Sequence, residues 1–147
     1  MNDYKKVDAK ILLVEDNIAD IRITKEIVQD YKLVNNLYIV RDGVEAIDFL
    51  RKKGKYSEVD TPNLILLDLN LPKKNGFEVL QEIKQDEKLK RIPVVILTVS
   101  DVEEDLIKAY NLHANCYVIK PLEMKEFYKI VESIVYFWFK IVKHPEV

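Results

Sequence analysis

The sequence is poor in cysteine, in long apolar runs and in excess positive charge. Its single cysteine, Cys116, excludes an internal disulfide and a cysteine-based metal site, and we interpret it as a small core residue. No apolar stretch reaches the roughly 18 residues of a membrane span, so we expect no membrane association. A formal net charge of −2 argues against direct DNA binding through phosphate contacts.

The composition that is present is typical of one globular domain. The 147 residues are 48% hydrophobic and 33% charged, which is enough for a layered core. We expect a single domain over residues 1–147, with a core from about 9 to about 140 and polar tails at 1–8 and 144–147. The polar first ten residues lack the apolar centre of a signal peptide, so we expect a cytoplasmic location.

Short apolar segments alternate with amphipathic ones along the chain. Asp42 and Ser100 are predicted helix N-caps, each with a Glu three positions later. The last helix is predicted from about Glu123 towards Lys143. Five strand–helix units with short connections indicate an α/β fold, a doubly wound sheet of five parallel strands with an extended C-terminal helix. The predicted strands are 10–14, 37–40, 63–67, 93–98 and 115–119.

The most informative stretch is the continuous apolar run that begins at Asn63 and ends in Asp68. An apolar run without alternation is typical of a strand that helices cover on both faces, as in parallel sheets. In such sheets, binding and catalysis occur just outside the carboxyl ends of the strands. Asp68 is therefore predicted to lie at the functional edge.

Polar side chains also follow the other predicted strands. Glu15 and Asp16 follow the first, Thr98 ends the fourth and Lys120 follows the fifth. Because clustered carboxylates repel one another, this edge suits a hard divalent cation such as Mg²⁺. With Lys120 and the Thr98 hydroxyl nearby, the site could hold a phosphoryl group, and in-line attack by Asp68 would give an acyl phosphate.

Each of these residues also has a plain structural interpretation. An acidic pair after a strand is commonly a helix N-cap, and a Lys-Pro pair is commonly part of a loop. The hydroxyl of Thr98 could cap the helix that follows its strand. It is the occurrence of all of them at successive strand ends that favours a shared site.

In four blocks, the chain closely resembles the receiver domains of two-component response regulators. The blocks are LLVED at 12–16, LLDLNLP at 66–72, VILT at 95–98 and YVIKP at 117–121. The resemblance implies a flavodoxin-like fold and phosphorylation of Asp68 by a sensor histidine kinase. It also implies a signalling switch that catalyses only its own phosphorylation and dephosphorylation. We expect its output to pass through another protein or through oligomerisation.

The same resemblance assigns roles to single residues. It implies Mg²⁺ bound by Asp16, Asp68 and the backbone carbonyl of Asn70, with Glu15 acting through water. It makes Thr98 and Lys120 the contacts of the phosphoryl group. Tyr117, three residues before Lys120, matches the aromatic switch position; a tyrosine packed at a sheet edge is the plainer interpretation.

Two positions depart from the family pattern. Val99 stands where the family prefers a smaller residue, which could narrow access to Asp68 and alter the rates of phosphotransfer or hydrolysis. The loop 73–76 reads Lys-Lys-Asn-Gly where the family often has Met-Asp-Gly, and Gly76 keeps the turn. A narrower resemblance, in 62–74, 90–95 and Phe137-Trp138, is to regulators paired with cyanobacterial-type phytochrome kinases.

Two other functions are compatible with a strand-end aspartate or with this fold. A phosphatase of the haloacid-dehalogenase type uses such an Asp as its nucleophile, but it needs a second Asp where this chain has Asn70. A flavodoxin-like electron carrier needs a phosphate-binding loop after the first strand, where Glu15 and Asp16 would repel phosphate.

Two structural predictions concern the last third of the chain. The Lys120-Pro121 peptide bond is expected to be cis, as the resemblance also implies. The last helix carries two sets of apolar residues, and one set is enough to pack against the sheet. We expect the second set to form the interface of a homodimer. The members of this second set are Tyr128, Val135, Phe139 and Val142.

Overall fold

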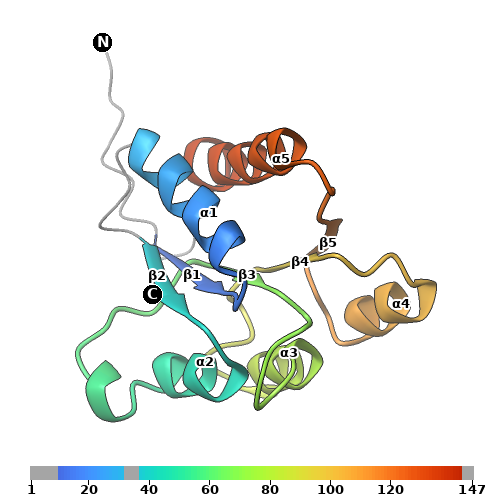
Figure 1. Ribbon diagram of the computed structural model, residues 1–147. Helices are drawn as coiled ribbons and strands as arrows, with labels where there is room; N and C mark the ends of the chain where they lie inside the picture. Colours follow the sequence, from blue (N-terminus) through green and yellow to red (C-terminus); the bar gives the residue numbers. More distant parts are fainter. Residues whose placement is uncertain (1–9, 32–36, 144–147) are drawn as a thin grey trace.

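A computed structural model describes residues 10–31 and 37–143; the predicted tails at 1–8 and 144–147 lie outside these residues. Five parallel strands form one sheet in the order β2-β1-β3-β4-β5, so the chain reverses its direction of winding beside β1 and β3 (Figure 1). This confirms the predicted doubly wound α/β fold. The strands are β1 Ile11–Val14, β2 Leu37–Val40, β3 Leu64–Leu67, β4 Val94–Thr98 and β5 Cys116–Ile119.

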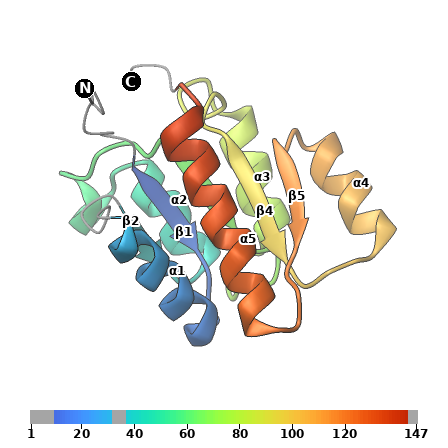
Figure 2. The same ribbon diagram turned by 90° about the horizontal axis from the view of Figure 1, so that it is seen from above.

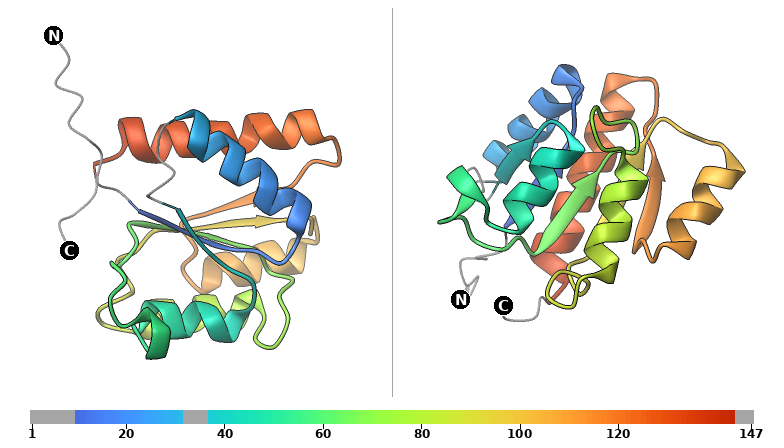
Figure 3. Two further views of the ribbon diagram at one scale, coloured as in Figure 1. Left: turned by 60° about the vertical axis from the view of Figure 1, so that its left-hand side comes forward. Right: turned by 90° about the horizontal axis from the view of Figure 1, so that it is seen from below.

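Helices cover both faces of the sheet. Helices α1 and α5 lie on one face, and α2, α3 and α4 lie on the other (Figures 1 and 3). None of the described helices is long and apolar enough to cross a membrane. The helices are α1 Ile18–Asp30, α2 Gly43–Leu50, α3 Gly76–Gln85, α4 Glu103–Asn111 and α5 Met124–Tyr136, with a 3₁₀ turn η2 at Gly54–Tyr56 and a π turn η3 at Phe137–Ile141.

The three central strands alternate between two core layers. Leu12 and Leu67 face the layer with α2 and α3, whereas Leu13 and Leu66 face the layer with α1 and α5. Every residue of β1, β3 and β4 is buried. The uninterrupted apolar runs of the sequence therefore reflect strands buried on both faces, as predicted.

Side-chain caps set the start of most helices. The predicted cap of α2 is confirmed, because the Asp42 carboxylate accepts the backbone N–H of Glu45. The predicted cap of α4 is wrong: this helix begins after Val102 with no side-chain cap, and the Ser100 hydroxyl bonds the Asp105 carboxylate instead, at 2.6 Å. The side chain of Ser100 therefore joins the loop before α4 to the first turn of that helix and leaves the helix end uncapped.

The predicted unpaired apolar face of the last helix is also wrong. Val135 is 0% exposed and Phe139 is 4% exposed, and both belong to the core layer beneath α5. Tyr128 is half-buried and donates its hydroxyl proton to Asp30 of α1 at 2.9 Å, and Val142 is half-buried. The reason is that α1 lies beside α5 on the same face of the sheet, so α5 is covered from two directions (Figure 2).

Candidate functional site

The carboxyl ends of β1, β3 and β5 bring three charged side chains together. The ammonium of Lys120, after β5, lies 2.5 Å from Oε1 of Glu15, after β1, and 3.1 Å from Oδ2 of Asp68, after β3. Thr98 ends β4, between the strands that carry Asp68 and Lys120. Parallel strands place these ends on one edge of the sheet, so side chains up to 105 positions apart meet there.

These charges are buried, which makes their pairing energetically important. Counted over the whole residue, Glu15 is 2% exposed and Asp68 and Lys120 are each 7% exposed. Burial, and then repulsion by Asp68, raise the pKa of Glu15 from its usual 4.5 to about 7. Burial alone would lower the pKa of Lys120, but hydrogen bonds to neighbouring carboxylates and attraction by Glu15 and Asp68 raise it overall. The edge therefore carries more negative charge than its lysine neutralises.

A third carboxylate, which the sequence patterns did not reveal, also binds the lysine. Oδ2 of Asp20 lies 2.8 Å from Nζ of Lys120. Asp20 belongs to the first turn of α1, where its backbone N–H donates to the Asn17 side chain that caps the helix. One signal was available: an acidic residue one turn beyond the Glu15-Asp16 pair faces the same edge if α1 starts at Ile18.

The two other predicted magnesium ligands, Asp16 and the backbone carbonyl of Asn70, stay a prediction, and the structure describes the contacts around them. The Asp16 carboxylate points towards Arg41, at 3.5 Å from Nη2, and its side chain is 49% exposed. Asn70 donates its backbone N–H to Oδ1 of Asp68 at 3.2 Å. Within residues 10–31 and 37–143, no group of three or more His, Cys, Asp or Glu side chains is placed to hold a metal ion. Asp16 pairs with Arg41 instead of facing the carboxylates that surround Lys120.

The donor chemistry of the edge nevertheless fits a hard divalent cation. Glu15, Asp16 and Asp68 offer carboxylate oxygens, the ligand type that Mg²⁺ prefers. Burial first, and then the nearby charge of Asp68, raise the pKa of Glu15, and the single Lys120 faces the carboxylates of Glu15, Asp20 and Asp68. A cation at this edge would relieve that repulsion.

The two predicted switch residues lie next to the charged cluster. Thr98 is fully buried, and its hydroxyl oxygen accepts the backbone N–H of Ser100 at 3.4 Å, so it does not cap α4. The Tyr117 hydroxyl donates to the backbone carbonyl of Ser100 at 3.0 Å, and burial raises the pKa of this phenol. Val99, between these contacts, is 60% exposed. Both switch residues therefore contact the loop before α4.

The predicted cis bond between Lys120 and Pro121 is wrong, because no peptide bond of the described residues is cis. The trans form before proline is intrinsically favoured by about 0.5–1 kcal/mol. In this form the backbone N–H of Lys120 donates to the Thr98 carbonyl at 2.6 Å while its ammonium reaches the carboxylates. Both the backbone N–H and the ammonium of Lys120 therefore have hydrogen-bond partners in the trans form.

Two glycines permit the backbone of the β3–α3 loop to pack closely at the site. A Cβ on Gly76 would lie 2.3 Å from the carbonyl oxygen of Asp68, and a Cβ on Gly43 would lie 1.9 Å from that of Lys74. Real Cβ atoms do not come this close to backbone oxygens. Gly76 therefore holds the turn after Asp68 through close packing, and Gly43 allows the same loop to rest on α2.

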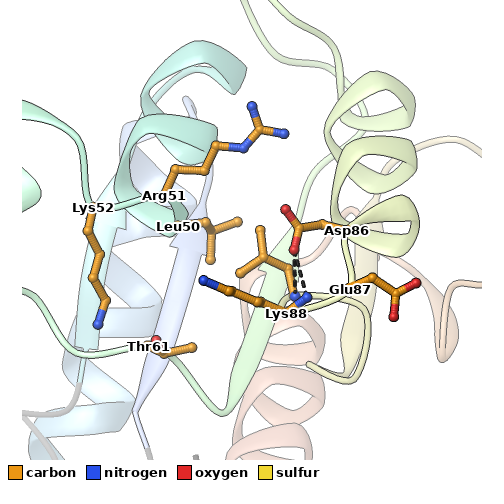
Figure 4. Close-up of a pocket in the computed structure, with 8 residues that line it drawn as sticks. Leu50, Arg51, Lys52, Thr61, Asp86, Glu87 and Lys88 are labelled. Atoms are coloured by element: carbon orange, nitrogen blue, oxygen red, sulfur yellow. Dashed lines mark hydrogen bonds between the residues drawn. The ribbon is translucent and has the colours of Figure 1, made fainter.

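A hollow of about 700 Å³ lies elsewhere, between the end of α2 and the segment after α3 (Figure 4). Most of its charged side chains, among them Arg51, Lys52 and Glu87, are exposed, in contrast to the buried charged side chains near Asp68. Oδ1 of Asp86 accepts hydrogen bonds from the backbone N–H groups of Lys88 and Leu89, at 2.8 and 3.1 Å. The Asp86 carboxylate thus caps a turn. The buried charged side chains lie instead at the carboxyl ends of the strands.

A family model described as the response regulator receiver domain matches residues 11–132. The chain belongs to this family. It is 49% identical over 145 residues to the response regulator Rcp1 of a Synechocystis species, a match that covers 99% of each chain. The match confirms the predicted function of a two-component response regulator and favours it over the phosphatase and electron-carrier alternatives.

Solved structures agree with this assignment. The phosphorylated cyanobacterial phytochrome response regulator RcpA shares 48% identity with the receiver domain, with a TM-score of 0.90 over 94% of this chain and 99% of that one. The Mn²⁺-bound form of Rcp1 shares 50% identity, with the same TM-score and coverage. These similarities confirm the predicted flavodoxin-like fold.

Proposed function

We propose that this receiver domain accepts a phosphoryl group on Asp68 from the phosphohistidine of a sensor histidine kinase. The observation that carries the proposal is the contact of Lys120 with Asp68, at 3.1 Å, on a buried strand edge rich in carboxylates. A buried lysine beside a strand-end aspartate places positive charge where phosphoryl oxygens would develop negative charge. The similarity to RcpA, solved in phosphorylated form, supports the same assignment.

The reaction would proceed by in-line displacement at phosphorus. A carboxylate oxygen of Asp68 forms the new P–O bond while the P–N bond of phosphohistidine breaks, and the imidazole nitrogen keeps the bonding electron pair. The Lys120 ammonium and the Thr98 hydroxyl bind the transferred phosphoryl oxygens. Later attack of water on phosphorus releases phosphate and restores the carboxylate. In this proposal the domain catalyses only its own phosphorylation and dephosphorylation.

Magnesium is the proposed cofactor, held by Asp16, Asp68 and the backbone carbonyl of Asn70, with Glu15 acting through water. When bound, the cation would neutralise the phosphoryl oxygens during transfer. The carboxylate donor set supports this proposal, because Glu15 and Asp68 are both buried at this edge. The Mn²⁺-bound form of Rcp1 supports a divalent cation in a relative.

Signal transmission is proposed to pass through Thr98 and Tyr117. A phosphoryl group would draw the Thr98 hydroxyl towards Asp68, away from the backbone N–H of Ser100 that it now accepts at 3.4 Å. A ligand shifts a conformational equilibrium only through contacts that differ between the two states, and this is such a contact. The Tyr117 bond to Ser100 links the same loop to β5, so rearrangement would reach α4, β5 and α5.

The proposed partner is a phytochrome-like histidine kinase in the cytoplasm, which the similarity to Rcp1 and RcpA supports. Purified chain should then receive phosphate faster from such a kinase than from a histidine kinase of another sensory class at equal concentration. Equal transfer from both kinases would contradict this choice of partner.

A homodimer is also proposed, with its contact at the exposed end of α5 and in η3. Tyr136, Phe137 and Ile141 are 50%, 47% and 59% exposed there, and adjacent exposed apolar side chains favour a protein contact. Light scattering should show a dimer that Phe137→Asp dissociates. Val102→Asp, at a 52% exposed apolar position before α4, is the matched control and should leave the mass unchanged.

The decisive experiment treats the chain with acetyl phosphate and Mg²⁺ and weighs the intact protein. The wild type should gain one phosphoryl group, and EDTA should abolish the gain. Asp68→Asn should not be labelled, whereas Asp101→Asn, which alters an exposed carboxylate in the loop before α4, should be labelled like the wild type. An adduct that persists in Asp68→Asn would refute the assignment.

A further inference from the structure

The ammonium of Lys120 is fully used in hydrogen bonding. An ammonium has three N–H donors, and here three carboxylates accept them. A phosphoryl oxygen can therefore bind Lys120 only by replacing one of these acceptors. The acceptor oxygens are Oε1 of Glu15 at 2.5 Å, Oδ2 of Asp20 at 2.8 Å and Oδ2 of Asp68 at 3.1 Å.

Asp20 differs from the other two acceptors in its origin and its support. Glu15 and Asp68 follow strands, whereas Asp20 lies in α1. Its backbone N–H donates to Oδ1 of Asn17 at 3.0 Å, and its carbonyl accepts the Thr24 hydroxyl at 3.0 Å. The side chain is 18% exposed, against 3% for Glu15 and 9% for Asp68, so it approaches Lys120 from the rim of the cluster.

We infer that Asp20 is a positioning residue, which anchors Lys120 to α1 and keeps one ammonium donor directed at Asp68. The inference rests on the proposed function. Phosphorylation converts the Asp68 carboxylate into an uncharged acyl group that carries negatively charged phosphoryl oxygens, and the donor that now faces Asp68 can turn to these oxygens. The two other donors then stay with Glu15 and Asp20, and the ammonium keeps its place.

The flexibility of lysine is the reason such an anchor is needed. A lysine carries its charge on four rotatable methylene groups, so its direction depends on what binds the ammonium. Without Asp20, one donor would face the rim and the ammonium could turn away from Asp68. Transition-state stabilisation is sensitive to this, since a misplacement of about 1 Å can cost roughly 100-fold in rate.

The position of Lys120 can be measured without phosphorylation. In ¹⁵N-labelled protein, the NMR signal of the Lys120 ammonium is identified by its loss in Lys120→Arg. Asp20→Ala should shift this signal or broaden it through faster exchange with water. Asp30→Ala is the matched control, because it removes a carboxylate at the other end of α1 that bonds Tyr128 and does not contact Lys120.

The effect on function is measured with acetyl phosphate over a range of concentrations at saturating Mg²⁺. Asp20→Ala should lower the maximal phosphorylation rate about tenfold, below the roughly 100-fold limit above, and leave the half-saturating concentration within about twofold. Asp20→Asn keeps an acceptor oxygen in the same place and should recover most of the lost rate. Asp30→Ala should match the wild type.

Several outcomes would overturn the inference. An unchanged Lys120 signal and a maximal rate within about twofold of wild type in Asp20→Ala would show that Asp20 does not position the lysine. An equal loss of rate in Asp30→Ala would assign the effect to general loosening of α1. If the wild type is not phosphorylated on Asp68, the proposed function fails, and the NMR comparison still decides whether Asp20 holds Lys120.

Discussion

Helices α1 and α4 both begin beside the charged edge, yet they are held very differently. Helix α1 is capped by Asn17 and buries five side chains against the sheet and α5. Helix α4 has no side-chain cap, buries only Ala109, and lies at the edge of the molecule beyond β5 (Figure 2). Local opening costs least where few apolar side chains are buried. Helix α1 is therefore expected to stay in place, whereas α4 is expected to move more easily. This difference suits an anchor for Lys120 on the α1 side and a conformational switch on the α4 side.

The largest expected difference between the two helices concerns packing. Ile27 of α1 is 0% exposed, and Ile27→Ala should lower the free energy of unfolding by about 2–5 kcal/mol through lost burial and a cavity. Ile107 of α4 is 50% exposed, and Ile107→Ala should change it by less than about 0.5 kcal/mol. Urea unfolding measures both values. Similar losses in the two variants would remove the contrast.

The second prediction concerns pH on the α1 side of the site. The pKa of Glu15 rises from its usual 4.5 to about 7 in the folded state, so the folded protein binds a proton more tightly than the unfolded chain. This contribution to stability is complete below pH 4.5 and is lost as the pH rises to about 7. The full change is about 3 kcal/mol.

Urea unfolding in EDTA between pH 4.5 and 8 tests this, with Glu15→Gln as the reference that lacks the titrating group. The stability of the wild type relative to Glu15→Gln should fall as the pH rises. A relative stability that is flat or increases over this range would contradict the burial of Glu15 beside Asp68.

A smaller effect is expected where Tyr117 ties β5 to the loop before α4. Tyr117→Phe removes the hydrogen bond to the Ser100 carbonyl and should cost about 1 kcal/mol. Because this bond restrains the start of α4, amide hydrogen exchange should quicken in α4 and stay unchanged in α1. Tyr110→Phe, at a 48% exposed position, is the control and should leave both helices unaffected.

The smallest effect is expected from giving α4 a side-chain cap of the kind that α1 already has. Val102→Asn supplies the missing side-chain cap and should stabilise the protein by about 0.5–1 kcal/mol. The reverse change in α1, Asn17→Ala, should cost about 1 kcal/mol. Thermal unfolding of both variants checks the pair. A destabilising Val102→Asn would mean that α4 needs the side chain of Val102 more than it needs a cap.

Much of the fold and the core of the site could be predicted from local patterns. The apolar runs that become β1, β3 and β4 are buried on both faces, and strand direction alone then brings Glu15, Asp68 and Lys120 to one edge. The strands and their shared edge follow from the pattern of apolar residues along the chain and from the alternation of strands and helices. Both patterns can be read from residues that are close in the sequence. The cap of α2 at Asp42 is equally local and was predicted.

Only the tertiary structure decided which partner each remaining side chain takes. Asp16 turns to Arg41, Asp20 joins the lysine, and Val135 and Phe139 are buried because α5 has α1 beside it as well as the sheet beneath it. The sequence by itself determined the strands and the edge on which they end. It could not determine these contacts, because their free energies depend on groups that are distant in the chain and meet only after packing.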